Sequence, residues 1–334
     1  MKFARRPLTV IVLLMVLLTA SSWGFLIHKT VQQLAIYELP SALKPFFYQN
    51  MDNLVYNAPR PDIRRNTDSN EATKHFIDLE AFGPNAANDM PLDWPSALAK
   101  YGHDSLVKYG YVPYHVVYMK EKLVQAFKNK NKDSILFYAA DLGHYIGDAN
   151  VPLHTTINYD GQLTNQKGLH SLWESMIPEI EIANYTLHAN HKATYLKHPD
   201  QAIWEAVRRA AILVPDLLAK EKSVSLQFTD AQKFRTQMRR GVESKSYTSD
   251  FAKAYAQALQ TSINDQLIHS ANLIADFYYT AWVDAGKPDL SSINTAFDKT
   301  AKQKMKAEQK VYKNNALLAQ KMLLSKKETT PQSN

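Results

Sequence analysis

The stretch DLGHYIGDANVPLH (residues 141–154) combines the apolar spacing of a helix with histidine and carboxylate side chains, and HSLWE (residues 170–174) repeats the pattern further along the chain. Positions i and i+4 of a helix lie on one face, about 5–6 Å apart at Cβ. The side chains of His144 and Asp148 therefore point in one direction, and so do those of His170 and Glu174. Zinc takes nitrogen and oxygen donors of these types at about 2.0–2.2 Å. The two motifs together predict a metal site built on helices.

The N-terminal residues have the pattern of a secretory signal peptide. Lys2, Arg5 and Arg6 form a basic start, residues 8–18 an apolar run, and residues 19–22 a small-residue exit. The alternative is an uncleaved membrane anchor, but the apolar run is shorter than the roughly 18 residues typical of a spanning helix. We therefore predict that residues 1–22 are removed and that the mature protein is secreted or periplasmic.

Cysteine content and charge narrow the class of protein further. The chain has no cysteine, so stability must come from packing and bound metal, and every metal ligand must be nitrogen or oxygen. The formal net charge of +7 comes from the two ends of the chain: residues 1–22 contribute +3 and residues 291–334 contribute +6. The remaining residues 23–290 carry −2, which does not support a global basic footprint for polyanions.

Helical periodicity dominates the body of the chain. Apolar residues recur at intervals of three and four in residues 113–128, 133–149, 201–221 and 251–284, while strand-like alternation is scarce. These patterns predict an all-α protein with a single domain over residues 23–290.

After residue 290 the composition changes to lysine, glutamine and alanine with scattered apolar positions. We expect residues 291–334 to form a basic tail, with a solvated amphipathic helix and a disordered end. The alternative is peripheral contact of this helix with an anionic membrane or nucleic acid.

Signal-peptide removal would add a further group of donors. The new N-terminus would be Trp23, whose α-amino group can bind metal when neutral and forms a chelate with its own carbonyl, and His28 follows closely. A separate segment supplies Asp62, which follows a proline, and then His75. Glu71 and Asp78 flank His75 in sequence and are candidates to orient its ring.

The order and spacing of these residues resemble the zinc-dependent phospholipase C / S1–P1 nuclease superfamily of secreted, mostly helical, three-zinc phosphoesterases. The resemblance runs from the mature tryptophan through the Asp…His pair and His-x3-Asp-x5-His to His-x3-Glu. It implies three zinc ions. The first would be held by Asp62, His75, His144 and Asp148, and the second by His154, His170 and Glu174. The third would be held by the amine and carbonyl of Trp23, by His28 and by Asp148, which it shares with the first.

The same resemblance implies a mechanism. Asp148 would bridge the first and third ions, and a hydroxide shared by that pair would be the nucleophile, with Asp62 and Asp148 as the catalytic carboxylates that hold it. Zinc lowers the pKa of bound water to about 7, which makes hydroxide available at neutral pH. The second zinc would neutralise the phosphoryl or leaving oxygen.

The sequence leaves the substrate open. The short spacing from Trp23 to His28 is typical of the nuclease branch and favours cleavage of single-stranded nucleic acid. Glu174 and the residues 147–150, Gly-Asp-Ala-Asn, are closer to the phospholipase branch, so hydrolysis of phospholipid head groups is the alternative. Monoester hydrolysis is a third possibility. A non-catalytic zinc-binding protein is the minor alternative, although structural zinc sites are closed and four-coordinate.

Overall fold

The computed structural model describes residues 24–239 and 242–326. Helices account for 67% of it and strands for 3%, which confirms the all-α prediction. Within these residues no helix is both long and apolar enough to cross a membrane. The predicted signal peptide and Trp23 lie outside the described residues.

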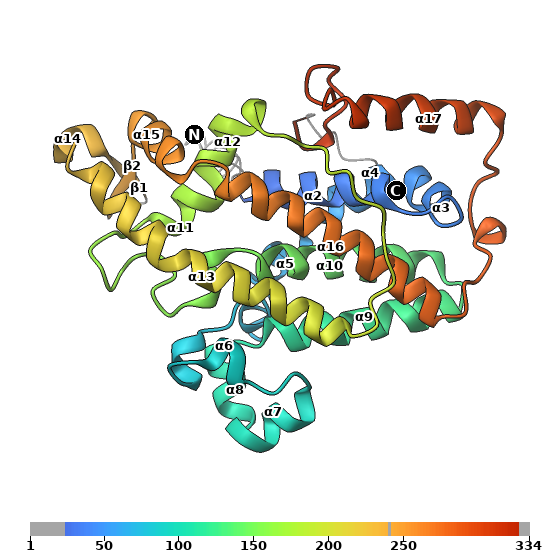
Figure 1. The fold of residues 1–334 in the computed structure, drawn as a ribbon, viewed down its shortest axis with the longest axis horizontal. Coiled ribbons are helices and arrows are strands. Elements are labelled where there is room, and N and C mark those ends of the chain that lie inside the picture. The colour runs from blue at the N-terminus through green and yellow to red at the C-terminus, as the bar shows by residue number, and fades with distance from the viewer. Residues whose placement is uncertain (1–23, 240–241, 327–334) are drawn as a thin grey trace, which may run out of the picture.

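Five long helices form the centre of the molecule (Figure 1). They are α2 (Phe25–Glu38), α9 (Val112–Lys128), α10 (Lys132–Ala149), α13 (Pro199–Ser225) and α16 (Ser262–Asp284). Helix α10 packs against α9, α2 and α16, and most of its side chains between residues 135 and 149 are buried. The helix that carries the opening motif therefore lies in the core of the protein, which explains the nearly continuous apolar sequence around its polar residues.

The predicted helices are largely confirmed, with one division. Residues 251–284 were expected as one helix, but α15 (Ser249–Leu259) ends before α16 begins. Gln260 between them has a φ of 55° and a ψ of −124°, which is far from helical geometry, so the first helix ends there. The spacing of apolar residues continues across the break, so periodicity alone did not reveal it.

Shorter elements surround the central helices. They are α3 (Lys44–Gln49), α4 (Met51–Asn57), α5 (Arg60–Arg64), α6 (Ala86–Asp89), α7 (Trp94–Tyr101), α8 (His103–Tyr109), α11 (Leu169–Ser171), a π-helical turn η4 (Leu172–Met176), α12 (Ile177–Glu181), α14 (Asp230–Lys233) and α17 (Lys299–Lys313). Single 3-10 turns are η1 (Ala72–Lys74), η2 (Leu79–Phe82), η3 (Pro152–Thr155), η5 (Ile182–Asn184), η6 (Ser291–Ile293) and η7 (Leu324–Lys326).

A two-stranded antiparallel hairpin, β1 (Phe234–Arg239) and β2 (Val242–Tyr247), is an element that the sequence did not predict. Its strands pair in the register Phe234↔Tyr247 to Arg239↔Val242. Most of its residues are polar, so the apolar alternation that marks a half-buried strand is missing. The hairpin lies at the end of the molecule formed by α14 and α15 (Figure 1).

The C-terminal segment corrects the expected domain boundary at residue 290. Helix α17 is present as predicted, but Tyr312, Leu317 and Leu323 are buried in the same core as α2. Gln33 on α2 donates to the carbonyl of Met322 at 2.9 Å and accepts from the amide of Leu324 at 2.8 Å. Residues 299–326 are therefore part of the domain and not a solvated tail. Their apolar positions lie mostly in turns after the helix, where helical spacing does not reveal a packed face.

The segment that carries His75 follows the 3-10 turn η1 and lies between two neighbours. On one side the amides of Tyr111 and Val112 donate to the carbonyls of residues 73 and 76, and on the other the amide of Ile77 donates to the carbonyl of His154 at 2.9 Å. These bonds fix His75 relative to His154. Residues 109–112 can approach the backbone of Phe76 only with a glycine at position 110. There φ is 84°, and a Cβ would lie 2.3 Å from the Phe76 carbonyl oxygen.

Gly110→Ala is expected to destabilise the protein by about 3 kcal/mol in urea unfolding, because the left-handed backbone and the clash with a backbone atom add together. Gly102→Ala is the matched control, since Gly102 has a φ of 75° with nothing within 4 Å of the added Cβ. The control isolates the backbone cost, about 1 kcal/mol. Equal losses in the two variants would contradict the proposed contact.

Candidate metal centre

Four predicted ligands come together at one point from three parts of the chain. Asp62 Oδ1 lies 3.7 Å from His75 Nδ1 and 3.8 Å from His144 Nε2, and these two nitrogens are 3.1 Å apart. Asp148 Oδ2 lies 2.8 Å from His75 Nδ1 and 3.2 Å from His144 Nε2. A tetrahedral zinc with bonds of about 2.0–2.2 Å separates its donors by about 3.3–3.6 Å. The Asp62, His75 and His144 donors therefore form a group that can hold a metal ion, and Asp148 contacts both histidines directly.

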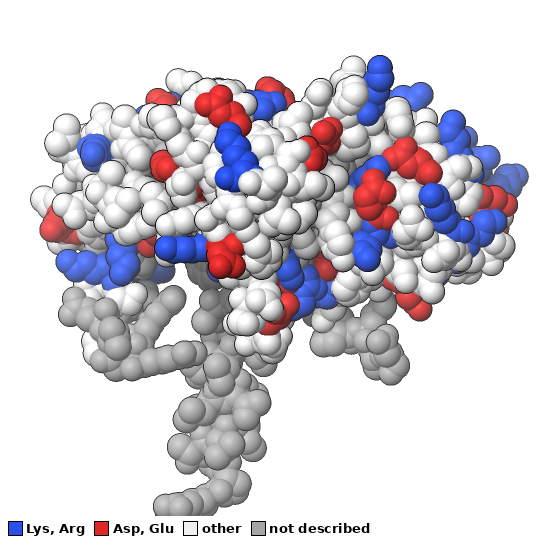
Figure 2. All heavy atoms as spheres, turned by 90° about the horizontal axis from the view of Figure 1, so that it is seen from below, with Lys and Arg blue, Asp and Glu red and all other residues white. Residues whose placement is uncertain are grey.

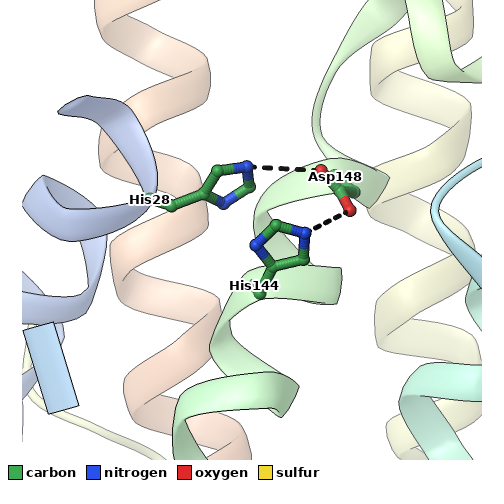
Figure 3. A group of neighbouring side chains, drawn as sticks. All are labelled: His28, His144 and Asp148. Atoms are coloured by element: carbon green, nitrogen blue, oxygen red, sulfur yellow. Dashed lines mark ion pairs between the residues drawn. The ribbon is translucent and has the colours of Figure 1, made fainter. Parts of the chain in front are cut away.

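The two oxygens of Asp148 face different neighbours. Figure 3 shows His144 and Asp148 on the same helix, α10, and His28 approaching from α2. Oδ2 faces His144 Nε2, while Oδ1 lies 3.5 Å from His28 Nε2. Asp148 can therefore donate to two ions at once, and the His28, His144 and Asp148 side chains form a group that can hold a metal ion.

The close approach of α2 and α10 at this point depends on a small residue. A Cβ at Gly147 would lie 3.1 Å from His28 Nδ1, tighter than ordinary van der Waals contact. Glycine at this position therefore lets the His28 ring reach the centre, where it stacks on the His144 ring at 3.9 Å between centroids.

A second group contains His154, His170 and Glu174. The Nε2 atoms of the two histidines lie 3.0 Å apart, and Glu174 Oε2 lies 2.5 Å from His170 Nε2 and 3.7 Å from His154 Nε2. Glu174 Oε1 is 3.8 Å from His28 Nε2, so this carboxylate connects the second group to the first. All the predicted ligands that fall within the described residues therefore belong to one continuous cluster.

Backbone carbonyls orient two of the rings. The Nδ1 of His144 lies 2.9 Å from the Ala58 carbonyl, and the Nδ1 of His154 lies 2.9 Å from the carbonyl of His75. A carbonyl only accepts hydrogen bonds, so each Nδ1 carries a proton and each Nε2 is the nitrogen that faces the centre. Metal-binding histidines usually have their second nitrogen held in this way.

Glu71 and His75 form the third oriented pair. Glu71 Oε1 lies 3.5 Å from His75 Nε2, and the carboxylate is itself held by Arg64 at 2.8 Å and Lys74 at 2.7 Å and by the Tyr145 hydroxyl. This supports the expectation that Glu71 orients the His75 ring. Asp78 has no such contact with His75 within the described residues.

A buried layer behind the ligands was missed in the sequence. Asp141, only 1% exposed, accepts from Arg60 at 2.6 Å and from Arg64 at 3.0 Å. Asp141 precedes Asp148 by two helical turns, and both arginines lie on α5 beside Asp62. The Arg-rich sequence around Pro61 could have indicated a role, but only the fold shows that Arg60 and Arg64 pair with the helix that carries the ligands.

The electrostatics of the cluster suit a cation. Burial and the nearby His144 lower the pKa of His28 to about 4, so the His28 ring is neutral at neutral pH and able to bind metal. Burial would raise the pKa of Asp148, but the surrounding histidines, His144 first, hold it well below its usual range. Burial would likewise lower the pKa of His144, but Asp148 and Asp62 raise it to about 9. A metal must displace that proton, so metal affinity should fall as pH falls.

The cluster opens on one side into a cleft of about 1230 Å³. His28, His75, His144 and Asp148 are buried, whereas His170 and Asp62 remain about a quarter exposed. Apart from the ligands Asp62 and Glu174, the charged residues that line the cleft are all basic: Lys29, Arg60, Arg65, Arg235 and Lys245. The face in Figure 2 shows Lys and Arg interspersed with Asp and Glu, which agrees with the mixed charge of the body.

No protein-family model matches this chain, and no curated protein is significantly similar to it. What the described residues establish is an all-α protein with buried histidine and carboxylate groups that can hold metal ions.

Proposed function

We propose that this protein is a zinc-dependent phosphoesterase of the phospholipase C / S1–P1 nuclease fold type that holds three zinc ions and cleaves single-stranded nucleic acid. The observation that carries the proposal is that two groups of donors able to hold a metal ion, Asp62, His75 and His144 in one and His28, His144 and Asp148 in the other, meet at His144, with the two oxygens of Asp148 turned toward different neighbours. Nitrogen and oxygen donors in this mixture favour zinc over magnesium or calcium, which prefer oxygen alone.

The ligand sets follow the groups described above. Asp62, His75 and His144 would hold one ion, with Asp148 beside the two histidines as a further donor, and His154, His170 and Glu174 would hold a second. His28 and Asp148 would hold a third together with the α-amino group of Trp23 after signal-peptide removal. Gly24 supports this last assignment, because it lines the cleft and its Cβ position is 3.9 Å from Glu174 Oε1. Zinc in such sites supplies Lewis acidity and an activated water at neutral pH.

The residues of the chain have separate roles in the proposed reaction. Asp62 and Asp148 hold and balance positive charge where the nucleophile is positioned, Asp148 from the buried side and Asp62 from the cleft. His170 and Glu174, on the open side of the cluster, place the second site next to the substrate. The site is not closed off from the cleft, which supports catalysis over a structural role for the metal.

The cleft favours a polyanion as substrate. Its volume exceeds the 300–1,000 Å³ or so typical of small-molecule pockets, and its walls carry basic side chains around the ligands. An extended nucleic-acid strand fits both features, whereas the cationic group of a zwitterionic phospholipid would face like charges.

The test is a side-by-side assay of purified protein on single-stranded DNA, RNA and phosphatidylcholine, together with metal analysis of the same sample. We expect close to three zinc ions per chain and cleavage of single-stranded nucleic acid. Activity on lipid alone would replace the nuclease with a phospholipase C, and fewer than two zinc ions would overturn the cluster. N-terminal sequencing of the exported protein that began at a residue other than Trp23 would remove the third site.

A further inference from the structure

The β1–β2 hairpin lines the same cleft as the metal centre but supplies no ligand to it. Arg235, Ser244, Lys245 and Ser246 all contribute to the cleft wall, and the arginine and the lysine are exposed. The polar sequence that hid this hairpin from prediction is therefore on the surface that a substrate would meet. The metal ligands alone do not explain why a polar hairpin with two basic residues borders this cleft.

The base of the hairpin is firmly attached next to the second metal group. Tyr247 is 3% exposed, and its hydroxyl lies 3.0 Å from Glu221 Oε1, which also pairs with Lys233 at 2.8 Å. Gly168, with a φ of 97°, lies against the Tyr247 ring, because an added Cβ would be 3.4 Å from it. The turn at Gly168 leads directly into His170, so the hairpin is held beside a predicted ligand.

One face of the hairpin has the chemistry of a phosphate site. In the observed register Arg235 pairs with Ser246, and Ser244 lies two residues further along the same strand, so the three side chains share a face. Arg235 Nε donates to Ser246 Oγ at 3.0 Å, which orients the guanidinium without using its terminal amino groups. A guanidinium beside two hydroxyls matches the oxygens of a phosphate. Lys245 stands between the two serines and so points to the other face of the hairpin, but it also lines the cleft and adds a positive charge there.

We propose that this hairpin binds backbone phosphates adjacent to the bond that is cleaved, with Arg235, Ser244 and Ser246 as one phosphate site and Lys245 as a second contact. The inference rests on the proposed function, since it specifies that the substrate of that same cleft is a nucleic-acid strand with several phosphates. A phosphate at Lys245 would use the part of the cleft wall that the hairpin supplies and the metal ligands do not.

The test compares binding of a cleavage-resistant fluorescent phosphorothioate oligothymidylate to the zinc-loaded protein over a range of salt concentrations. For the double variant R235Q/K245Q we expect the Kd to rise roughly tenfold at low salt. We also expect the slope of log K against log salt to flatten by about 1.4, since each phosphate contact on a single strand contributes about 0.7. S244A/S246A should weaken binding and leave the salt slope unchanged, because serine carries no charge.

The matched control is R209Q/K253Q, which removes the same charges from exposed positions on α13 and α15 outside the cleft. This control should bind the oligonucleotide as the parent protein does. An equal effect of the two double variants would overturn the inference, because it would show a general charge effect. Loss of binding to phosphatidylcholine vesicles but not to the oligonucleotide in R235Q/K245Q would also overturn it.

Hydrolysis of bis(p-nitrophenyl) phosphate separates this inference from the proposed function. That diester tests the metal centre without any flanking phosphate. If the parent protein cleaves no phosphodiester, the proposed function fails. If it cleaves the diester and R235Q/K245Q keeps the parent salt slope, the hairpin inference fails alone.

Discussion

Asp148→Asn is expected to lower phosphodiester hydrolysis at least about 1,000-fold and to reduce the zinc content from three ions to one per chain. The asparagine keeps the shape of the side chain but removes the charge and one of the two oxygen donors. Because the two oxygens of Asp148 face His144 and His28 separately, this single change weakens two sites. The His154, His170 and Glu174 group keeps its three donors.

The measurement combines kcat/KM on a small diester with metal analysis after dialysis. Asp276→Asn is the control, because Asp276 is also a buried carboxylate held near a histidine, at 2.9 Å from His191, but lies apart from the cluster. The control should keep its zinc and its activity while losing some stability. Asp148→Asn protein with full zinc content would contradict the bridging role.

Removal of metal by a chelator is expected to lower the melting temperature by about 10 °C or more. Each site filled at 1,000 times its Kd adds about 4 kcal/mol, and for a domain of this size 1 kcal/mol corresponds to roughly 2 °C. Without cations, the charge of Asp148, which is only 1% exposed, is balanced only by the histidine rings around it, with His75 at 2.8 Å and His144 at 3.2 Å. A buried charge that is only partly balanced is costly, so the apoprotein should be less stable than the metal-loaded protein.

Differential scanning calorimetry before and after chelation checks this prediction. Zinc should restore the transition, and magnesium should not, because the cluster offers mostly imidazole nitrogen. A melting temperature that stays the same in protein shown to be free of metal would rule out the cluster as a stabilising element. Restoration by magnesium would change the identity of the proposed ion.

The sequence was most informative where chemistry follows a local repeat. His144 with Asp148 and His170 with Glu174 are i,i+4 pairs, and both pairs are brought together as predicted, with 3.2 Å and 2.5 Å between their donors. The helices over residues 113–128 and 133–149 were found from apolar spacing for the same reason. In each case one helical turn determines the relation between the residues, so no distant contact is needed.

Other features depended on contacts between distant segments. The hairpin has no apolar alternation, and its base is held by Tyr247, Glu221 and Lys233. The C-terminal segment packs through Tyr312 and the turns that follow it onto α2, although its composition is that of a solvated helix. Amino-acid composition predicts only whether a segment is, on average, exposed or buried. Which of its side chains are buried depends on the neighbours that the fold places beside them.

The sequence by itself determined the all-α class, the positions of α9, α10 and α13, and the nitrogen and oxygen donor types of groups that can hold a metal ion. Only the tertiary structure decided that Asp62, His75 and His28 reach the same point as Asp148, and that Arg60 and Arg64 lie behind them. It also decided that a basic hairpin borders the cleft. The physical reason is the distance along the chain over which each effect acts. Helical periodicity relates residues within one or two turns, whereas the cluster joins residues from 28 to 174. They are brought together by packing of α2 on α10 and of the His75 segment on His154.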